Sequence, residues 1–131
     1  MEWKIDYLEQ DGIVRMKTSG PATFDHNKKM SEEALALAHK NGSNRFLVDH
    51  RDLEHGLSTL QVDDMPRMLK QIGVTPEDRI AIVFNPTSPI SNAFQFFRNS
   101  AFIQSLQVRI FIDPDEAITW LKSAPSNESE M

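Results

Sequence analysis

The chain has 131 residues, close to the usual length of one domain, and its 40% hydrophobic and 25% charged residues are ordinary for a globular protein. It contains no cysteine, which excludes disulfides and thiolate metal sites and suits a reducing compartment. The net charge is −5 and the 14 basic residues are scattered, so the basic face that nucleic-acid binding requires is not expected.

The N-terminal segment carries charged residues from position 2 onward, so it lacks the apolar run of a signal peptide. No stretch of the chain approaches the roughly 18 apolar residues of a membrane-spanning helix. We therefore expect a cytoplasmic protein without a membrane span.

Two short strands are predicted at residues 3–7 and 14–18, where apolar and polar side chains alternate. Alternation with a period of two indicates strands with one buried face and one solvated face. Asp11-Gly12 lies between them, and this dipeptide is a strong hairpin signal. The two strands should therefore pair antiparallel.

A first helix is predicted at residues 23–40. Thr23 is suited to capping its N-terminus, and Asp25 in the first turn suits the helix dipole. Gly42, after Asn41, can adopt the left-handed conformation that ends a helix. The inner stripe, at helical spacing, consists of Met30, Ala34, Leu37 and Ala38.

Residues 46–48 form a short apolar run without alternation, which is typical of a central parallel strand that is buried on both faces. A polar loop is expected to follow at residues 49–56. A second helix is predicted at about residues 63–72, with Pro66 in its first turn, where a missing N–H costs least. Its inner stripe consists of Met65, Met68, Leu69 and Ile72.

The clearest buried strand is predicted at residues 80–84. A third helix follows, and we expect Ser88 to cap it with Pro89 at the first helical position. Its inner stripe consists of Ile90, Phe94, Phe97 and Ala101.

The last strand is predicted at residues 108–112. Asp113 and Glu116 then have the spacing of a capping box and open a final helix. Residues 124–131 are expected to form a flexible tail, because they contain no large apolar side chain before Met131.

The order of elements is therefore β-β-α-β-α-β-α-β-α, which predicts a single α/β domain over residues 1–123. Strands separated by helices form parallel pairs through right-handed crossovers, and the first hairpin adds an antiparallel pair. We expect a mixed, mostly parallel five-stranded sheet covered by helices.

A binding site is expected beyond the carboxyl ends of the strands, where ligands bind in open α/β sheets. Three predicted loops form this edge, at residues 49–58, 85–91 and 112–115. Helix N-termini open there and offer N–H groups to an anionic ligand. The candidate binding residues are Asp49, His50, Arg51, His55, Ser58, Asn85, Ser88 and Ser91.

Motifs for metal binding or nucleophilic catalysis are not found. His50 and His55 are five residues apart, which is no standard spacing for a zinc pair. The chain has no G-x-S-x-G elbow, P-loop or dinucleotide fingerprint. We expect no metal, no cofactor and no catalytic residue, and the alternative is an enzyme that uses Asp49 with His50 or His55. His26 and His39 belong to the first helix and should face water.

Asp49 has two interpretations. It ends a predicted buried strand, where burial or the neighbouring Arg51 would displace its pKa and suit it to acid–base catalysis. An aspartate after a strand is more often a turn former that bonds to backbone amides. We favour the second interpretation, with Arg51 paired to Asp52 or Glu54.

Four phenylalanines lie on the third helix. Phe94 and Phe97 are three residues apart and are expected in the core. Phe96 and Phe102 lie off that stripe, and we expect them to extend a broad buried face. The alternatives are an apolar pocket or an exposed partner surface, and with Trp3 on the edge hairpin these side chains are the candidates for a homodimer contact.

Several segments resemble the SpoIIAA-like branch of STAS-like bacterial proteins. They are Phe46-Leu47-Val48-Asp49, Arg79-Ile80-Ala81-Ile82-Val83, and the closing strand at residues 108–113 with the helix at residues 116–121. The most distinctive part is this end, where a strand runs into an acidic cap and an Ala-x-x-Trp-Leu helix. The resemblance covers nearly the whole chain except the tail, and it implies a fold shared with anti-sigma-factor antagonists and CRAL-TRIO lipid carriers.

In those antagonists, a serine at the start of the helix after the third strand is phosphorylated within an Asp-Ser-Ser-Gly type motif. Ser58 stands at the comparable position, in the segment Glu54-His55-Gly56-Leu57-Ser58-Thr59, which lacks that motif. The resemblance therefore implies Ser58 as the phosphorylation candidate, because a phosphate there adds charge near a helix N-terminus.

Three functions are expected, in this order. The first is a non-enzymatic binding or regulatory module that meets a protein partner, as the anti-sigma-factor antagonists do. The second is a carrier of a small hydrophobic ligand, suggested by the phenylalanine-rich third helix and by the carrier fold. The third is the enzyme built on Asp49 and His50 or His55.

Overall fold

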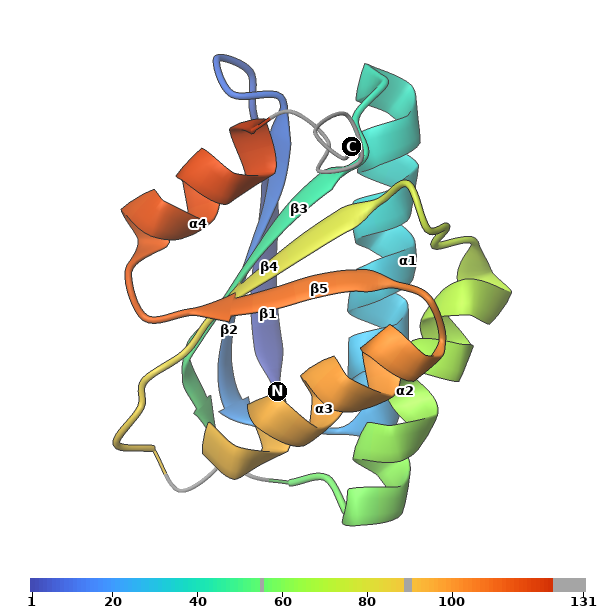
Figure 1. Cartoon of the computed structure of the whole chain (residues 1–131), viewed down its shortest axis with the longest axis vertical. Helices are drawn as coiled ribbons and strands as arrows, with labels where there is room; N and C mark the ends of the chain where they lie inside the picture. The colour runs from blue at the N-terminus through green and yellow to red at the C-terminus, as the bar shows by residue number, and fades with distance from the viewer. Residues whose placement is uncertain (55, 89–90, 124–131) are drawn as a thin grey trace.

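The computed structural model describes residues 1–54, 56–88 and 91–123 of the chain. Strands and helices follow one another in it in the predicted order (Figure 1). The elements are β1 (Glu2–Leu8), β2 (Ile13–Pro21), α1 (Phe24–Asn41), β3 (Arg45–Glu54), α2 (Thr59–Ile72), β4 (Arg79–Val83), α3 (Ser91–Ile103), β5 (Gln107–Phe111) and α4 (Pro114–Lys122).

The sheet has the strand order β1-β2-β3-β4-β5. β1 pairs antiparallel with β2 through the predicted hairpin, and the pairs from β2 to β5 are parallel. The structure therefore confirms an α/β fold with a mixed, mostly parallel five-stranded sheet. The register aligns Val14 with Phe46, Phe46 with Ile80, and Ile80 with Val108, so one apolar row crosses four strands.

The helices cover the sheet unequally. The helices α1, α2 and α3 pack on one face, and α4 packs on the other (Figure 1). Each of the first three connects two parallel neighbours in a sheet that grows in one direction, so crossovers of one hand place them on the same face. α4 follows the last strand and is free to fold onto the other face.

Each face has its own core. Ile80 and Ile82 of β4 point toward α1–α3, and Ala81 and Val83 point toward α4. Residues 80–84 are buried, as the apolar run without alternation predicts, and Arg79 at the start of β4 is buried as well. The three-helix side is the larger core, and the α4 side consists of Ile13, Leu47, Ala81, Val83, Ala117 and Leu121.

The predicted helix ends are confirmed at three positions. The hydroxyl of Thr23 accepts a hydrogen bond from the amide of His26 at 3.1 Å, and Asp113 accepts one from the amide of Asp115 at 2.9 Å. Gly42 has a φ of 67°, the left-handed conformation that ends α1. N-terminal caps of this kind each stabilise a helix by about 1 kcal/mol.

The loop predicted at residues 49–56 is wrong, because β3 continues to Glu54. The register shifts between Lys17 and Ser19 of β2, where β3 contains one extra residue, and beyond this bulge Ser19, Gly20 and Pro21 pair with residues 52–54. The pairing keeps a polar stretch in the sheet that the residue pattern alone assigns to a loop.

The second helix starts earlier than predicted. Ser58 is its cap and Thr59 its first residue, and Ser58 and Gln61 form a capping box with reciprocal bonds of 3.2 and 2.9 Å. The described part of α3 begins at Ser91, and the expected Pro89 and Ile90 lie outside the described residues. The same is true of the expected tail at residues 124–131.

The expectation that Phe96 and Phe102 belong to the core is wrong. Phe96 is 39% exposed and Phe102 is 82% exposed, whereas Phe94 and Phe97 are buried as expected. The inward stripe of α3 continues through Ala101, so the two other rings lie on the outer side of the helix.

Candidate functional site

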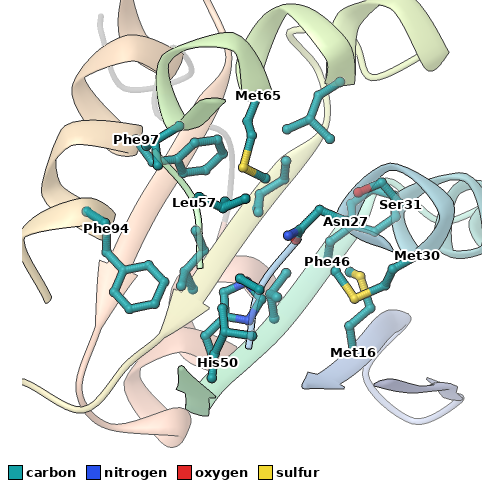
Figure 2. Close-up of a pocket in the computed structure, with 18 of the residues that line it drawn as sticks. Met16, Asn27, Met30, Ser31, Phe46, His50, Leu57, Met65, Phe94 and Phe97 are labelled. Carbon is teal, nitrogen blue, oxygen red and sulfur yellow. The ribbon is translucent and has the colours of Figure 1, made fainter. Parts of the chain in front are cut away.

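A cavity lies between the sheet and the three-helix layer (Figure 2). Its volume is about 110 Å³. Figure 2 shows Phe94 and Phe97 on one side, Asn27 and Met30 on the other, and His50 at the lower end. Most of the remaining wall is aliphatic and includes Ala34, Val48, Val62, Leu69, Ile80 and Ile82. The packing therefore leaves an apolar space where a continuous core is the usual arrangement.

The cavity reaches the surface at the connection between β3 and α2. Glu54 and Gly56 line it and are exposed, and Leu57 lines it and is half-buried. This connection crosses very close to the end of β2, because a Cβ atom at Gly56 would lie 2.1 Å from the carbonyl oxygen of Ala22. The amide of Ala22 also bonds to the carbonyl of Glu54 at 3.1 Å, which ties the two segments together.

His50 forms one end of the cavity. Alternation along β3 turns it toward the helices, on the same side as Val48, and it is only 8% exposed. Its Nδ1 atom lies 2.6 Å from the hydroxyl of Thr18, and its ring stacks on Phe94 with centroids 5.6 Å apart. Nε2 has no hydrogen-bond partner within residues 1–54, 56–88 and 91–123.

Burial determines the charge of His50. Desolvation lowers its pKa to about 4, and the nearby charge of Asp49 opposes this only in part. The ring is therefore neutral at neutral pH. A neutral imidazole presents one donor and one acceptor, so it can bond a ligand without bringing a charge into the apolar space.

Two further polar side chains line the cavity from α1. Asn27 is only 3% exposed, and its Nδ2 donates to the carbonyl of Thr23 at 2.9 Å and contacts the sulfur of Met1 at 3.6 Å. In the described part of the chain its Oδ1 has no partner. Ser31, one turn further along, is half-buried and also lines the cavity. Buried polar atoms usually have a partner, so the open Nε2 of His50 and Oδ1 of Asn27 mark this cavity as more than a packing gap.

Asp49 and Arg51 lie on the opposite face of the sheet. Arg51 donates to both carboxylate oxygens of Asp49, at 2.9 and 2.7 Å, rather than to Asp52 or Glu54 as expected from the sequence. Burial works to raise the pKa of Asp49, but the hydrogen bonds from Arg51 outweigh it and leave the pKa below its ordinary value. Asp49 also accepts the backbone amide of Arg51 at 3.1 Å. Asp49 and His50 therefore do not face one common site.

The other candidates that the structure describes are separate from the cavity wall. Ser58 is exposed and caps α2, and Asn85 forms a turn in which its side chain accepts from the amide and hydroxyl of Thr87 at 3.0 and 2.8 Å. Ser88 and Ser91 are half-buried near the start of α3. His55 lies outside the described residues. Among the described candidates, the structure brings only His50 to the cavity.

Asn27 and Ser31 were not predicted as site residues, although the sequence pattern contains a signal for them. Both stand on the inner side of α1 with Met30 and Ala34, at spacings of three and four residues. A polar residue on an otherwise apolar stripe is a sign of a buried polar contact. His26 and His39, in contrast, are exposed as expected.

Comparison with known proteins gives no family for the chain. No protein-family model matches it, and no curated protein matches it. Within the described residues, no helix has the length and apolar character needed to cross a membrane. The same residues contain no group of three or more His, Cys, Asp or Glu side chains placed to hold a metal ion. The cavity is thus the feature on which a function can be argued.

Proposed function

We propose that the protein is a non-enzymatic binding protein that holds a small, mostly apolar ligand between its sheet and α1–α3. The observation that carries this proposal is the apolar cavity of about 110 Å³ with the buried, unpartnered Nε2 of His50 on its wall. An engineered apolar cavity of about 150 Å³ binds benzene, and the cavity here is smaller but is lined in part by the exposed Glu54 and Gly56, so a single ring or a short hydrocarbon chain is the largest ligand that we expect it to hold.

Transfer of the ligand's apolar surface from water into the cavity would stabilise the complex. Burial of apolar surface contributes roughly 25 cal/mol per Å², and the walls of the cavity already exist, so little ordering of the protein opposes binding. The exposed residues Glu54 and Gly56 on the lining give the ligand a route from the surface. These properties support the carriage of a small hydrophobic molecule, and the fold that the sequence resemblance implies, shared with CRAL-TRIO carriers, is in line with it.

Toluene is a suitable probe, because it has the size and apolarity that the cavity accepts. We expect saturable chemical-shift changes in NMR spectra at Val48, Ile82 and Phe94, which line the cavity. Ala34→Leu adds three carbon atoms inside the cavity and should weaken toluene binding at least about tenfold, since the added volume takes the place of the ligand. Ala36→Leu adds the same atoms to the exposed side of α1 and should bind as the wild type does.

Ala93→Leu is a second filling variant, on α3, in case Ala34→Leu does not fold. A thermal unfolding curve of each variant establishes that it is folded before its toluene affinity is compared. Absence of saturable toluene binding in the wild type, or equal affinity in the folded filling variants, would contradict the proposed function.

A regulatory switch at Ser58 is the second candidate function. Ser58 is exposed and caps a 14-residue helix, where a phosphate would add charge favourable to the helix N-terminus. Its hydroxyl already bonds to the amide of Gln61, so a phosphate oxygen must replace that bond. Incubation with kinases of a cell lysate followed by peptide mass spectrometry tests this function, and a phosphate-free peptide around Ser58 would remove it.

A further inference from the structure

The open nitrogen of His50 indicates what kind of ligand the proposed site selects, and the inference rests on the proposed function. His50 is buried, and Thr18, which contacts its Nδ1, is not part of the cavity wall. Nδ1 is therefore hydrogen-bonded to another residue of the sheet. The other ring nitrogen, Nε2, is left for whatever enters the cavity.

The hydrogen bonds of Thr18 determine which nitrogen carries the proton. The Thr18 hydroxyl has one hydrogen and lies 3.3 Å from the carbonyl oxygen of Asp49, which can only accept. It also lies 2.6 Å from Nδ1 of His50. Both contacts are hydrogen bonds only if the hydroxyl donates to Asp49 and accepts from a protonated Nδ1. Nε2 then carries a lone pair and no hydrogen.

Asn27, the second buried polar side chain on the cavity wall, also leaves a hydrogen-bond acceptor open. Nδ2 of Asn27 is bonded to the carbonyl of Thr23, and the Oδ1 acceptor of Asn27 has no partner in the described part of the chain. The two buried open polar atoms on the cavity wall are thus both acceptors, and the half-buried hydroxyl of Ser31 can accept a hydrogen bond as well. A ligand that donates a hydrogen bond satisfies such a wall, and a ligand that only accepts leaves it unsatisfied.

The charges around the cavity exclude an acid. Among the described residues that line it, Glu54 at the mouth is the charged one, and it is acidic. Burial lowers the pKa of His50 to about 4, so the ring supplies no positive charge at neutral pH. A carboxylate ligand would therefore lose its hydration without gaining a cationic partner.

We propose that the cavity selects a small uncharged alcohol or phenol, whose hydroxyl donates to Nε2 of His50 while its hydrocarbon part packs against Phe94 and the aliphatic wall (Figure 2). A site that bonds a hydroxyl discriminates strongly against analogues that lack it, because the buried acceptor is then left unpaired. The same wall rejects the corresponding acid.

Three probes of one ring size separate the alternatives: toluene, its hydroxylated relative p-cresol, and benzoate. Calorimetric titration of the wild type should show p-cresol binding about tenfold more tightly than toluene, and benzoate not binding. In His50→Phe the order of toluene and p-cresol should reverse, because the hydroxyl then enters the cavity without an acceptor. His39→Phe makes the same replacement on the exposed side of α1 and should keep the wild-type order.

A second measurement does not depend on the folding of a variant. Nitrogen-15 NMR of the imidazole distinguishes a protonated from an unprotonated ring nitrogen, and we expect hydrogen on Nδ1 and none on Nε2 of His50. A hydrogen on Nε2, or p-cresol binding no more tightly than toluene, would overturn this inference while the proposed function stands. Failure of both p-cresol and toluene to bind would overturn the inference and the proposed function together.

Discussion

His50 and Phe94 stack ring on ring, with their centroids 5.6 Å apart and their planes inclined by 16°. One side chain comes from β3 and the other from α3, so the stack joins the sheet to the helix layer at the end of the cavity. The imidazole in this stack is neutral, because burial lowers its pKa to about 4. The contact between sheet and helices therefore responds to acid.

We expect the protein to lose stability as the pH falls from about 6.5 to about 4. In this range the unfolded chain takes up a proton at His50, whose ordinary pKa is 6.5, and the folded chain, with a pKa of about 4, does not. The stability that the neutral His50 ring contributes is fully present above pH 6.5 and is lost progressively toward pH 4. The total loss in the free energy of unfolding amounts to about 3 kcal/mol. Urea unfolding at several pH values measures the free energy of unfolding over this range.

Two variants assign the acid response to its residue. His50→Phe removes the titrating ring and keeps an aromatic partner for Phe94, so the slope of stability against pH should flatten between pH 6.5 and 4. His39→Phe replaces an exposed histidine and should keep the slope. Asp49, whose pKa is lowered, loses its contribution only below its ordinary value of 3.8, outside this range. A slope in His50→Phe as steep as that of the wild type would assign the effect to another group.

Gly56→Ala should destabilise the protein and weaken ligand binding at the mouth of the cavity. The added Cβ would lie 2.1 Å from the carbonyl oxygen of Ala22, a backbone atom that cannot move aside as a flexible side chain can. Overpacking of this kind costs about 1–3 kcal/mol. Thermal unfolding measures the cost, and toluene titration measures the effect on the mouth.

Gly42→Ala is the matched control for that variant. A Cβ at Gly42 meets no atom within 4 Å, so its cost comes from the φ of 67° alone and is about 1–2 kcal/mol. Toluene affinity should change in Gly56→Ala and remain unchanged in Gly42→Ala. Identical affinities in the two variants would locate the mouth away from the connection between β3 and α2.

Arg79→Ala should loosen α4 from the sheet. The buried Arg79 guanidinium donates to the carbonyls of Trp120 and Ser123 at 2.8 and 3.1 Å and to the Ser123 hydroxyl at 2.9 Å, and it lies 5.2 Å from the centre of the Trp120 ring. Its loss leaves carbonyls at the end of α4 without their charged donor, at a cost of about 2–3 kcal/mol. Urea unfolding and hydrogen exchange in α4 measure the effect.

Arg109 provides the comparison for Arg79. It also lies over the Trp120 ring, at 5.5 Å, but it is exposed and makes no hydrogen bond to α4 within the described residues. Arg109→Ala should therefore cost only about 0.5–1 kcal/mol. Equal losses in the two variants would mean that stacking on Trp120, rather than the hydrogen bonds of Arg79, holds the helix.

Local signals in the sequence predicted much of the fold. Asp11-Gly12 indicated the hairpin, Thr23 and Asp113 indicated two helix starts, and the apolar run at residues 80–84 indicated a central strand. Each of these signals depends on a few neighbouring residues. Residues 49–54 were missed because their place in β3 depends on pairing with β2 beyond a bulge, which no local pattern encodes.

The cavity was not predictable from residue patterns. An apolar stripe predicts which side of a helix is buried, but the volume left between stripes depends on how far apart the helices and the sheet settle. His50 was a candidate for the loop edge, and its role on the cavity wall follows from a position in β3 that the sequence did not reveal. Phe96 and Phe102 suggested a wider core than exists, because aromatic residues on the outer side of α3 resemble core residues in composition.

Crystals held under xenon pressure test the central claim most directly, because xenon enters apolar cavities of this size and is located by its own scattering. We predict a xenon atom between the sheet and α1–α3, in contact with Val48, Ile82 and Phe94. Side chains that close this space, with xenon absent from it or bound only at the outer surface, would contradict the existence of the ligand cavity.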